Sequence, residues 1–199
     1  MNERARPSTE DFLAALEKDE DYQRRLAEAE AEADAQAEML AVAEVPLTRA
    51  LHAAGVDVES VWEVYPKLAG YALALPVLVE HLERGGYPDL TTDALGQALC
   101  ARAAEPYWDR LRAIYLSPRT EAEEVAVAIA LSGAAGPKQF DDLVELVGRE
   151  DRGDSRLFFL RPINRIGRER GRAVVAALRD HPLLGAEATA ILKGRSPNE

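Results

Sequence analysis

The feature that most constrains this chain is a pair of short helices that recurs between Leu73 and Leu192. Apolar residues follow helical spacing within each helix, and tight turns rich in Gly and Pro separate the helices. The last apolar residues of the first helix in each pair are separated by 34, 31 and 31 residues (Leu82, Leu116, Val147 and Leu178). A two-helix period of this length is typical of a stacked α-solenoid, because one pair cannot bury its apolar face alone.

The composition supports an all-α fold. Ala and Leu dominate, and aromatic residues make up only 6% of the 199 residues. Ala and Leu favour helices, whereas strands favour β-branched and aromatic residues. We therefore predict an all-α chain in which residues 45–193 form one domain of stacked helix pairs, with a closed helical bundle as the alternative. The residues predicted to share one core are Leu99, Leu111, Leu131, Leu143 and Ile166.

Residues 1–44 are predicted to form an acidic N-terminal helical arm. The segment holds 13 acidic and 5 basic residues, so it carries most of the formal net charge of −11. Ser8 is the expected N-cap, and residues 1–7 and the polar tail 194–199 are expected to be disordered or frayed. Two interpretations stay open for the arm. It is either a solvated helix that covers one end of the domain, or a segment that binds a partner or forms a coiled coil.

Local signals predict the turns around the first helices. Pro46 is expected to begin a helix that Gly55 ends as the residue after the C-cap. Asp57 is expected to cap a second short helix, and the two together resemble a divergent first repeat. Pro162 lies inside the returning helix of the third pair, where proline predicts a kink.

Four segments share the pattern of a returning helix with small residues in its middle and glycine at or after its end: DALGQAL, EEVAVAIALSGAAG, SRLFFLRPINRIG and AEATAILKG. With these segments, residues 73–193 resemble HEAT-type repeats. The segment AGVDVESVW with the following LPVLVEHLERGGYPD is also similar to uncharacterised bacterial HEAT-repeat proteins. The resemblance implies a HEAT-like α-solenoid with a concave surface that the returning helices line. It carries over no catalytic residue.

Side chains suited to catalysis or metal binding do not cluster in the sequence. His52, His81 and His181 have no partner at helical spacing, so no metal site is predicted. Cys100 is interpreted as a small buried hydrophobe, because no adjacent base would activate it. The double-glycine turn joins two helices and lacks the strand of a nucleotide-binding loop. We expect neither catalytic residues nor a cofactor.

A basic segment stands out in this acidic chain. Between residues 152 and 172, seven arginines against two acids give a net charge of +5, and we call these seven the arginine island. Arginine is well matched to carboxylates and phosphates, so the segment is a candidate site for a partner or an anion. The predicted binding residues are Arg156, Arg161, Arg165, Arg168 and Arg172. Alternatively, the arginines pair with acids of the same chain or form a polar ladder between repeats.

Charge and composition narrow the function. An acidic surface repels phosphate backbones and anionic membranes, which disfavours nucleic acids and membranes as partners. No apolar signal segment is visible and one cysteine fits a reducing compartment, so a cytoplasmic location is expected. We predict a non-catalytic protein-interaction or scaffold module with a protein partner of unknown identity. The alternatives are an antitoxin- or immunity-like inhibitor of a basic partner and, with less support, a HEAT-like DNA-repair or lyase enzyme.

Overall fold

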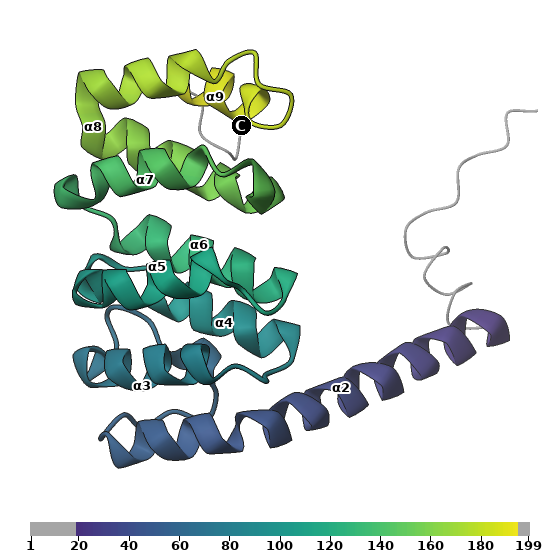
Figure 1. The fold of residues 1–199 in the computed structure, drawn as a ribbon. Helices are drawn as coiled ribbons and strands as arrows, with labels where there is room; N and C mark the ends of the chain where they lie inside the picture. Colours follow the sequence, from purple (N-terminus) through teal and green to yellow (C-terminus); the bar gives the residue numbers. More distant parts are fainter. Residues whose placement is uncertain (1–18, 195–199) are drawn as a thin grey trace, which may run out of the picture. The chain divides into compact units, whose positions relative to one another are not determined.

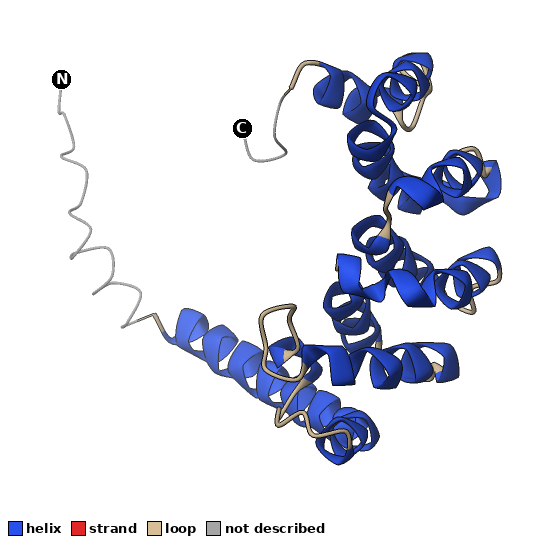
Figure 2. Ribbon diagram, turned by 90° about the vertical axis from the view of Figure 1, so that its left-hand side faces the viewer, coloured by secondary structure: helices blue, strands red, loops and turns tan. Residues whose placement is uncertain are grey.

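The computed structural model describes residues 19–194, whose regular elements are all helical, with no strand among them (Figure 2). The prediction of an all-α chain is therefore confirmed for this part of the sequence. The chain divides into two compact units, Met1–Val42 and Ala43–Glu199. The expectations for residues 1–18 and 195–199, which include the N-cap at Ser8, lie outside the described residues.

The first helix, α2 (Glu20–Ala53), corrects one prediction. Pro46 lies inside α2 and does not begin a helix. Proline has no amide to donate to the carbonyl four residues earlier, at Val42, so one helical hydrogen bond is lost there. The turns that follow are nevertheless held, because Leu47 and Leu51 are fully buried in the core of the second unit. Tertiary packing of this kind supplies most of the stability of helices in proteins.

The loop after α2 begins as predicted and then departs from the prediction. Gly55 adopts a φ of +84°, and its amide donates to a carbonyl of the last helical turn, so glycine ends the helix as expected. The helix predicted after Asp57 does not form. In its place is a short 3-10 turn, η1 (Val61–Glu63), and its N-cap is Ser60, whose side chain accepts from the amide of Trp62.

A buried carboxylate holds this loop. The side chain of Glu44 is only 5% exposed and accepts hydrogen bonds from Ser60 Oγ at 2.8 Å and Thr91 Oγ1 at 3.2 Å. It also accepts from the amide of Val61 at 3.1 Å. The last residue of the acidic segment defined from the sequence therefore serves the packing of the second unit, because its charge is used to order a turn.

The remaining helices follow one another as pairs in chain order (Figure 1). Short 3-10 turns lie in three of the connections: η2 (Arg102–Tyr107), η3 (Pro137–Gln139) and η4 (Glu150–Arg156). The returning helices α4, α6 and α8 also pack against one another in that order. The helices are α3 (Tyr71–Arg84), α4 (Asp89–Leu99), α5 (Trp108–Leu116), α6 (Glu121–Ala134), α7 (Phe140–Val147), α8 (Leu157–Ala177) and α9 (Gly185–Leu192).

Two glycines allow the backbones of α4 and α6 to approach closely. A Cβ added at Gly96 would collide with the backbone of Ala126, and one added at Gly133 would collide with the backbone of Cys100. Only glycine leaves this space at the contact. Gly96, in the middle of α4, and Gly133, near the end of α6, are therefore positions at which these two segments touch.

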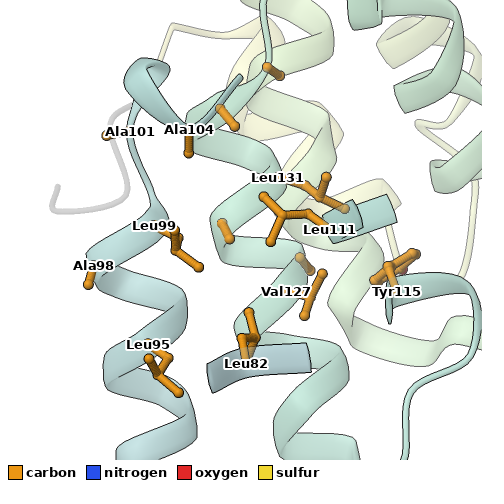
Figure 3. Close-up of a cluster of buried hydrophobic side chains, with 14 of the residues drawn as sticks. Leu82, Leu95, Ala98, Leu99, Ala101, Ala104, Leu111, Tyr115, Val127 and Leu131 are labelled. Atoms are coloured by element: carbon orange, nitrogen blue, oxygen red, sulfur yellow. The ribbon is translucent and has the colours of Figure 1, made fainter. Parts of the chain in front are cut away.

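One apolar cluster runs through the helix pairs (Figure 3). Leu99, Leu111, Leu131 and Leu143 are all fully buried within it, which confirms four of the five predicted core residues. The fifth, Ile166, is only partly buried and packs against the cluster from its margin.

Helix α8 changes direction at Arg168, whereas the sequence predicted a kink at Pro162. Arg168 has φ of 51° and ψ of −121°, which divides α8 into two helical stretches. Pro162 is buried inside the first stretch, where the loss of one amide donor is accommodated. The positive φ at Arg168 produces the kink instead, and α8 as a whole packs with α7 and α9.

Candidate partner-binding groove

A groove with a volume of about 1180 Å³ lies among the C-terminal ends of α4 and α6, the first stretch of α8, and α9. Pockets for small molecules usually have volumes of roughly 300–1,000 Å³. The groove is therefore large enough for a segment of polymer. Its apolar lining includes Leu157, Phe158, Pro162, Leu183 and Ile191, and its charged lining comprises Arg102, Arg161, Arg165 and Glu187.

One face of α8 supplies the most distinctive wall of the groove. Phe158, Arg161, Pro162 and Arg165 are spaced so that all four lie on the same side of the helix, and all four line the groove. Phe158 is 40% exposed although it is a large apolar residue. An exposed aromatic ring is thus placed within one or two helical turns of two arginines.

Arg161 is held by an incomplete interaction. Its Nη2 lies 2.9 Å from Oε1 of Glu187 on α9, which is the distance of an ion pair. The same nitrogen is buried and makes no hydrogen bond with any group in residues 19–194. Buried polar atoms usually have a hydrogen-bond partner, and Arg112 Nε and Arg152 Nε are further exceptions in residues 19–194. The pair with Glu187 therefore leaves Arg161 able to accept a better-aligned carboxylate.

The other two arginines of the groove differ in how far they are engaged. Arg165 is exposed and has no ion pair or hydrogen bond within the part of the chain that the structure describes. Arg102 donates to Ala134 O at 2.7 Å and pairs with Glu105 at 2.7 Å, while half of its side chain stays exposed. With three arginines and one glutamate in its lining, the groove is basic in a chain of net charge −11.

The structure brings together only two of the five predicted binding residues. Arg161 and Arg165 line the groove, whereas Arg168 and Arg172 are exposed outside it, because the turn at Arg168 ends the helical face. Arg156 is 5% exposed, and its Nε donates to Gly153 O at 3.0 Å. Its charge is therefore used inside the fold and is not part of a surface patch.

Other arginines connect one helix pair to the next, and we call these contacts the seams. Arg119, in the turn before α6, donates to Arg84 O, the last residue of α3, at 2.6 Å. Arg152, in η4, donates to Leu116 O, the last residue of α5, at 2.7 Å. Arg152, a member of the arginine island, therefore has a structural contact between two helix pairs, as the alternative interpretation of these arginines expected.

Sequence reasoning missed several residues of the groove. Cys100 was interpreted as buried, but it is half-buried, lines the groove and lies 4.0 Å from Ser132 Oγ through its Sγ. The reason is that α4 ends at Leu99, so Cys100 already belongs to the turn. Phe158 could have been found, because it stands three residues before Arg161 on the same helical face. Glu187 and Arg102 come from distant parts of the chain and gave no local signal.

Elsewhere, a pocket of about 90 Å³ lies beside His81, Tyr87 and Arg119. His81 Nδ1 lies 2.5 Å from the Tyr87 hydroxyl, and burial, aided by the charge of Arg84, lowers the pKa of the histidine. A lowered pKa favours the neutral ring, whose unprotonated nitrogen can accept a hydrogen bond from the Tyr87 hydroxyl. The pocket is small and its polar groups satisfy one another, which indicates a structural role.

Residues 19–194 contain no group of side chains that could hold a metal ion. No helix among them combines the length and the apolar character needed to span a bilayer. Comparison with known proteins gives no relative, since no family model, curated protein or solved structure matches the chain. The groove is therefore interpreted from its own geometry.

Proposed function

We propose that this protein is a non-catalytic protein-interaction module built on HEAT-like repeats, and that the groove holds a segment of a partner protein. The observation that carries the proposal is the face of α8 on which Phe158, Arg161 and Arg165 line a groove of about 1180 Å³. Aromatic residues and arginine are the side chains most enriched where proteins bind one another.

The spacing of contacts along the chain supports the HEAT-like architecture. Hydrogen bonds between neighbouring pairs join residues that are separated by nearly one sequence period: Arg102 to Ala134, Trp108 to Asp142, and Arg152 to Leu116. In stacked repeats each unit contacts only its neighbours, so contacts recur at the length of the repeat. The groove lies on the returning helices, which is the side that such arrays use for binding.

An antitoxin- or immunity-like inhibitor of a basic partner is the second candidate function. It is favoured by residues 20–42 of α2, whose acidic side chains are exposed and outnumber the two arginines of that segment. A surface of this kind attracts a basic protein through long-range electrostatics. In that case binding would use the arm and would not need the groove.

Affinity capture from the native cell, followed by reconstitution with the purified partner, tests the proposal. We expect a protein that is retained by the wild type and by Arg168→Glu, a control outside the groove, but lost by Arg165→Glu. Loss of the same protein after the acids of residues 20–42 are changed to Gln or Asn, with Arg165→Glu still binding, would favour the inhibitor. Chemical modification of the captured partner would contradict the non-catalytic assignment.

A further inference from the structure

We infer that the groove recognises an acidic polypeptide segment that carries a large apolar side chain, and that Glu187 is an internal competitor for the ligand's carboxylate. The inference rests on the proposed function, because it names the ligand class of the same groove. It adds a direction of effect that a generic binding surface would not predict: removing the negative charge of Glu187 should strengthen binding.

The charged residues that line the groove favour a ligand with a negatively charged group. Arg161 and Arg165 are four residues apart on α8, which places their Cβ atoms roughly 6 Å from each other. Two guanidinium groups at this spacing can flank one carboxylate. Arg165 has no partner in residues 19–194, and Arg161 has a buried Nη2 without a hydrogen bond. A carboxylate placed between them would satisfy both groups with charge-assisted hydrogen bonds.

The apolar lining selects a second feature of the ligand. Phe158 precedes Arg161 by less than one helical turn and remains 40% exposed, and Pro162 and Leu183 line the groove beside it. An apolar side chain next to the bound carboxylate would cover this surface and remove it from water. Burying a large apolar side chain contributes about 1.5–3 kcal/mol, so a carboxylate alone would bind much more weakly than an acidic segment with an apolar anchor.

In the free protein, the carboxylate of Glu187 pairs with Arg161, where the ligand's carboxylate is proposed to bind. It reaches Arg161 from α9, at 2.9 Å, but in a geometry that gives Nη2 no hydrogen bond. The Arg161 side chain as a whole is 41% exposed and that of Glu187 is 29% exposed, although the paired nitrogen Nη2 is buried. A ligand carboxylate that reaches both Arg161 and Arg165 gains two charge-assisted contacts where Glu187 makes one, so it can displace Glu187. Glu187 also prevents Arg161 from standing as an uncompensated cation before the ligand arrives.

A polypeptide fits these observations better than a nucleic acid. Phe158 could stack on a base and the arginines could bind phosphates, as in single-strand binding grooves. A continuous polyphosphate needs a long run of basic contacts, however, and the groove offers three arginines beside Glu187. A peptide can offer one or two carboxylates to the basic groove without bringing a charge at every residue.

The test uses three fluorescein-labelled peptides of equal length and fluorescence anisotropy with the full-length protein. The first peptide alternates Glu with Phe and Leu, the second replaces every Glu by Gln, and the third replaces Phe and Leu by Ser. A single-stranded oligothymidine serves as the nucleic-acid probe. Cys100 gives a local readout, because it lines the groove and is the only cysteine of the chain. Its rate of alkylation should fall when a ligand fills the groove.

The expected result is binding of the first peptide with slower alkylation of Cys100, and at least about tenfold weaker binding of the other two. Arg165→Gln should weaken binding of the first peptide by about tenfold, whereas Arg168→Gln, outside the groove, should not. Glu187→Gln should strengthen binding by about two- to fivefold. Arg161→Lys should weaken it, because lysine keeps the charge but loses the planar pair of donors.

The failures can be told apart. If Glu187→Gln melts like the wild type yet leaves binding unchanged or weaker, Glu187 is not a competitor. If that variant does not fold, Glu187→Asp replaces it, and the shorter acid should also strengthen binding. Tighter binding of oligothymidine, or self-association that Arg165→Gln removes, overturns the assignment to an acidic segment of another protein. If no peptide binds but capture of a native partner depends on Arg165, the ligand class is wrong and the proposed function stands.

Discussion

The seams and the groove use the same side chain for opposite purposes. At the seams, Arg119 and Arg152 each donate to a backbone carbonyl at the end of α3 or α5 and also pair with a glutamate, Glu123 or Glu124. In the groove, Arg165 has no partner within residues 19–194, and Arg161 has only a distorted ion pair with Glu187. The difference shows that the contacts of each arginine must be known before an arginine-rich segment is interpreted as a binding surface.

The seam arginines are explained by the chemistry of helix ends. The last four carbonyls of a helix have no partner within the helix, and the C-terminal end carries a partial negative charge. Arg84 and Leu116 are the last residues of α3 and α5, and each has its carbonyl bound by an arginine from the turn of the following pair. The same solution is therefore used twice, by arginines that are 33 residues apart in the sequence (152 − 119).

The largest effect is expected in the core beneath the seams. Leu111→Ala and Leu143→Ala should each lower the free energy of unfolding by about 2–5 kcal/mol, because both side chains are fully buried and their removal leaves a cavity. Leu90→Ala is the matched control, since Leu90 is 44% exposed on α4. Chemical denaturation would measure all three, and equal stability of the core variants and the control would show that the packing register is wrong.

A smaller loss is expected when a seam arginine is removed. Arg152→Gln should cost about 1–3 kcal/mol, because it frees Leu116 O and separates Arg152 from Glu124. Arg149→Gln, at the N-cap of η4, is the control, because its exposed pair with Asp151 should contribute little to stability. Thermal melts of the two variants compare them directly. Similar losses for both would mean that the seam contact is no stronger than a surface ion pair.

His81 should make stability depend on pH. Burial lowers the pKa of His81 below 6.5 in the folded protein, while the unfolded chain takes up a proton near that value. As pH falls below about 6.5, protons therefore favour the unfolded state, and stability should fall by at most about 1.4 kcal/mol per pH unit. His81→Leu should flatten this part of the curve between pH 7 and 5.5, measured by urea denaturation. If the stability of the wild type changed as little with pH as that of the variant, the pKa of His81 would not be lowered in the folded protein.

The helical class and most of the core could be predicted from the sequence, because both depend on local spacing. Leu99, Leu111, Leu131 and Leu143 recur at helical positions, and burial follows from that pattern. The errors at Pro46 and Pro162 have one cause. A proline removes a single hydrogen bond, and buried neighbours such as Leu47 can compensate for that loss, so proline alone does not set a helix boundary.

The groove was only half accessible, because its walls come from segments far apart in the chain. Arg161 and Arg165 share one helical face, and that face can be read from their spacing. Cys100 follows α4 and Glu187 lies on α9, and only the tertiary fold brings them beside α8. The exclusion of Arg156 and Arg168 likewise depends on burial and on one backbone angle, neither of which residue type alone specifies.

The variants of the groove arginines should change stability least, although they should weaken binding most. Arg165→Gln should change the free energy of unfolding by less than about 0.5 kcal/mol, because Arg165 is exposed and has no partner in residues 19–194. Arg161→Gln should cost little more, since its pair with Glu187 is partly exposed. Urea denaturation of these variants and of Arg152→Gln compares directly how much the groove arginines and a seam arginine contribute to stability. A loss above about 1 kcal/mol for Arg165→Gln would show that the groove arginine serves the fold, as the seam arginines do.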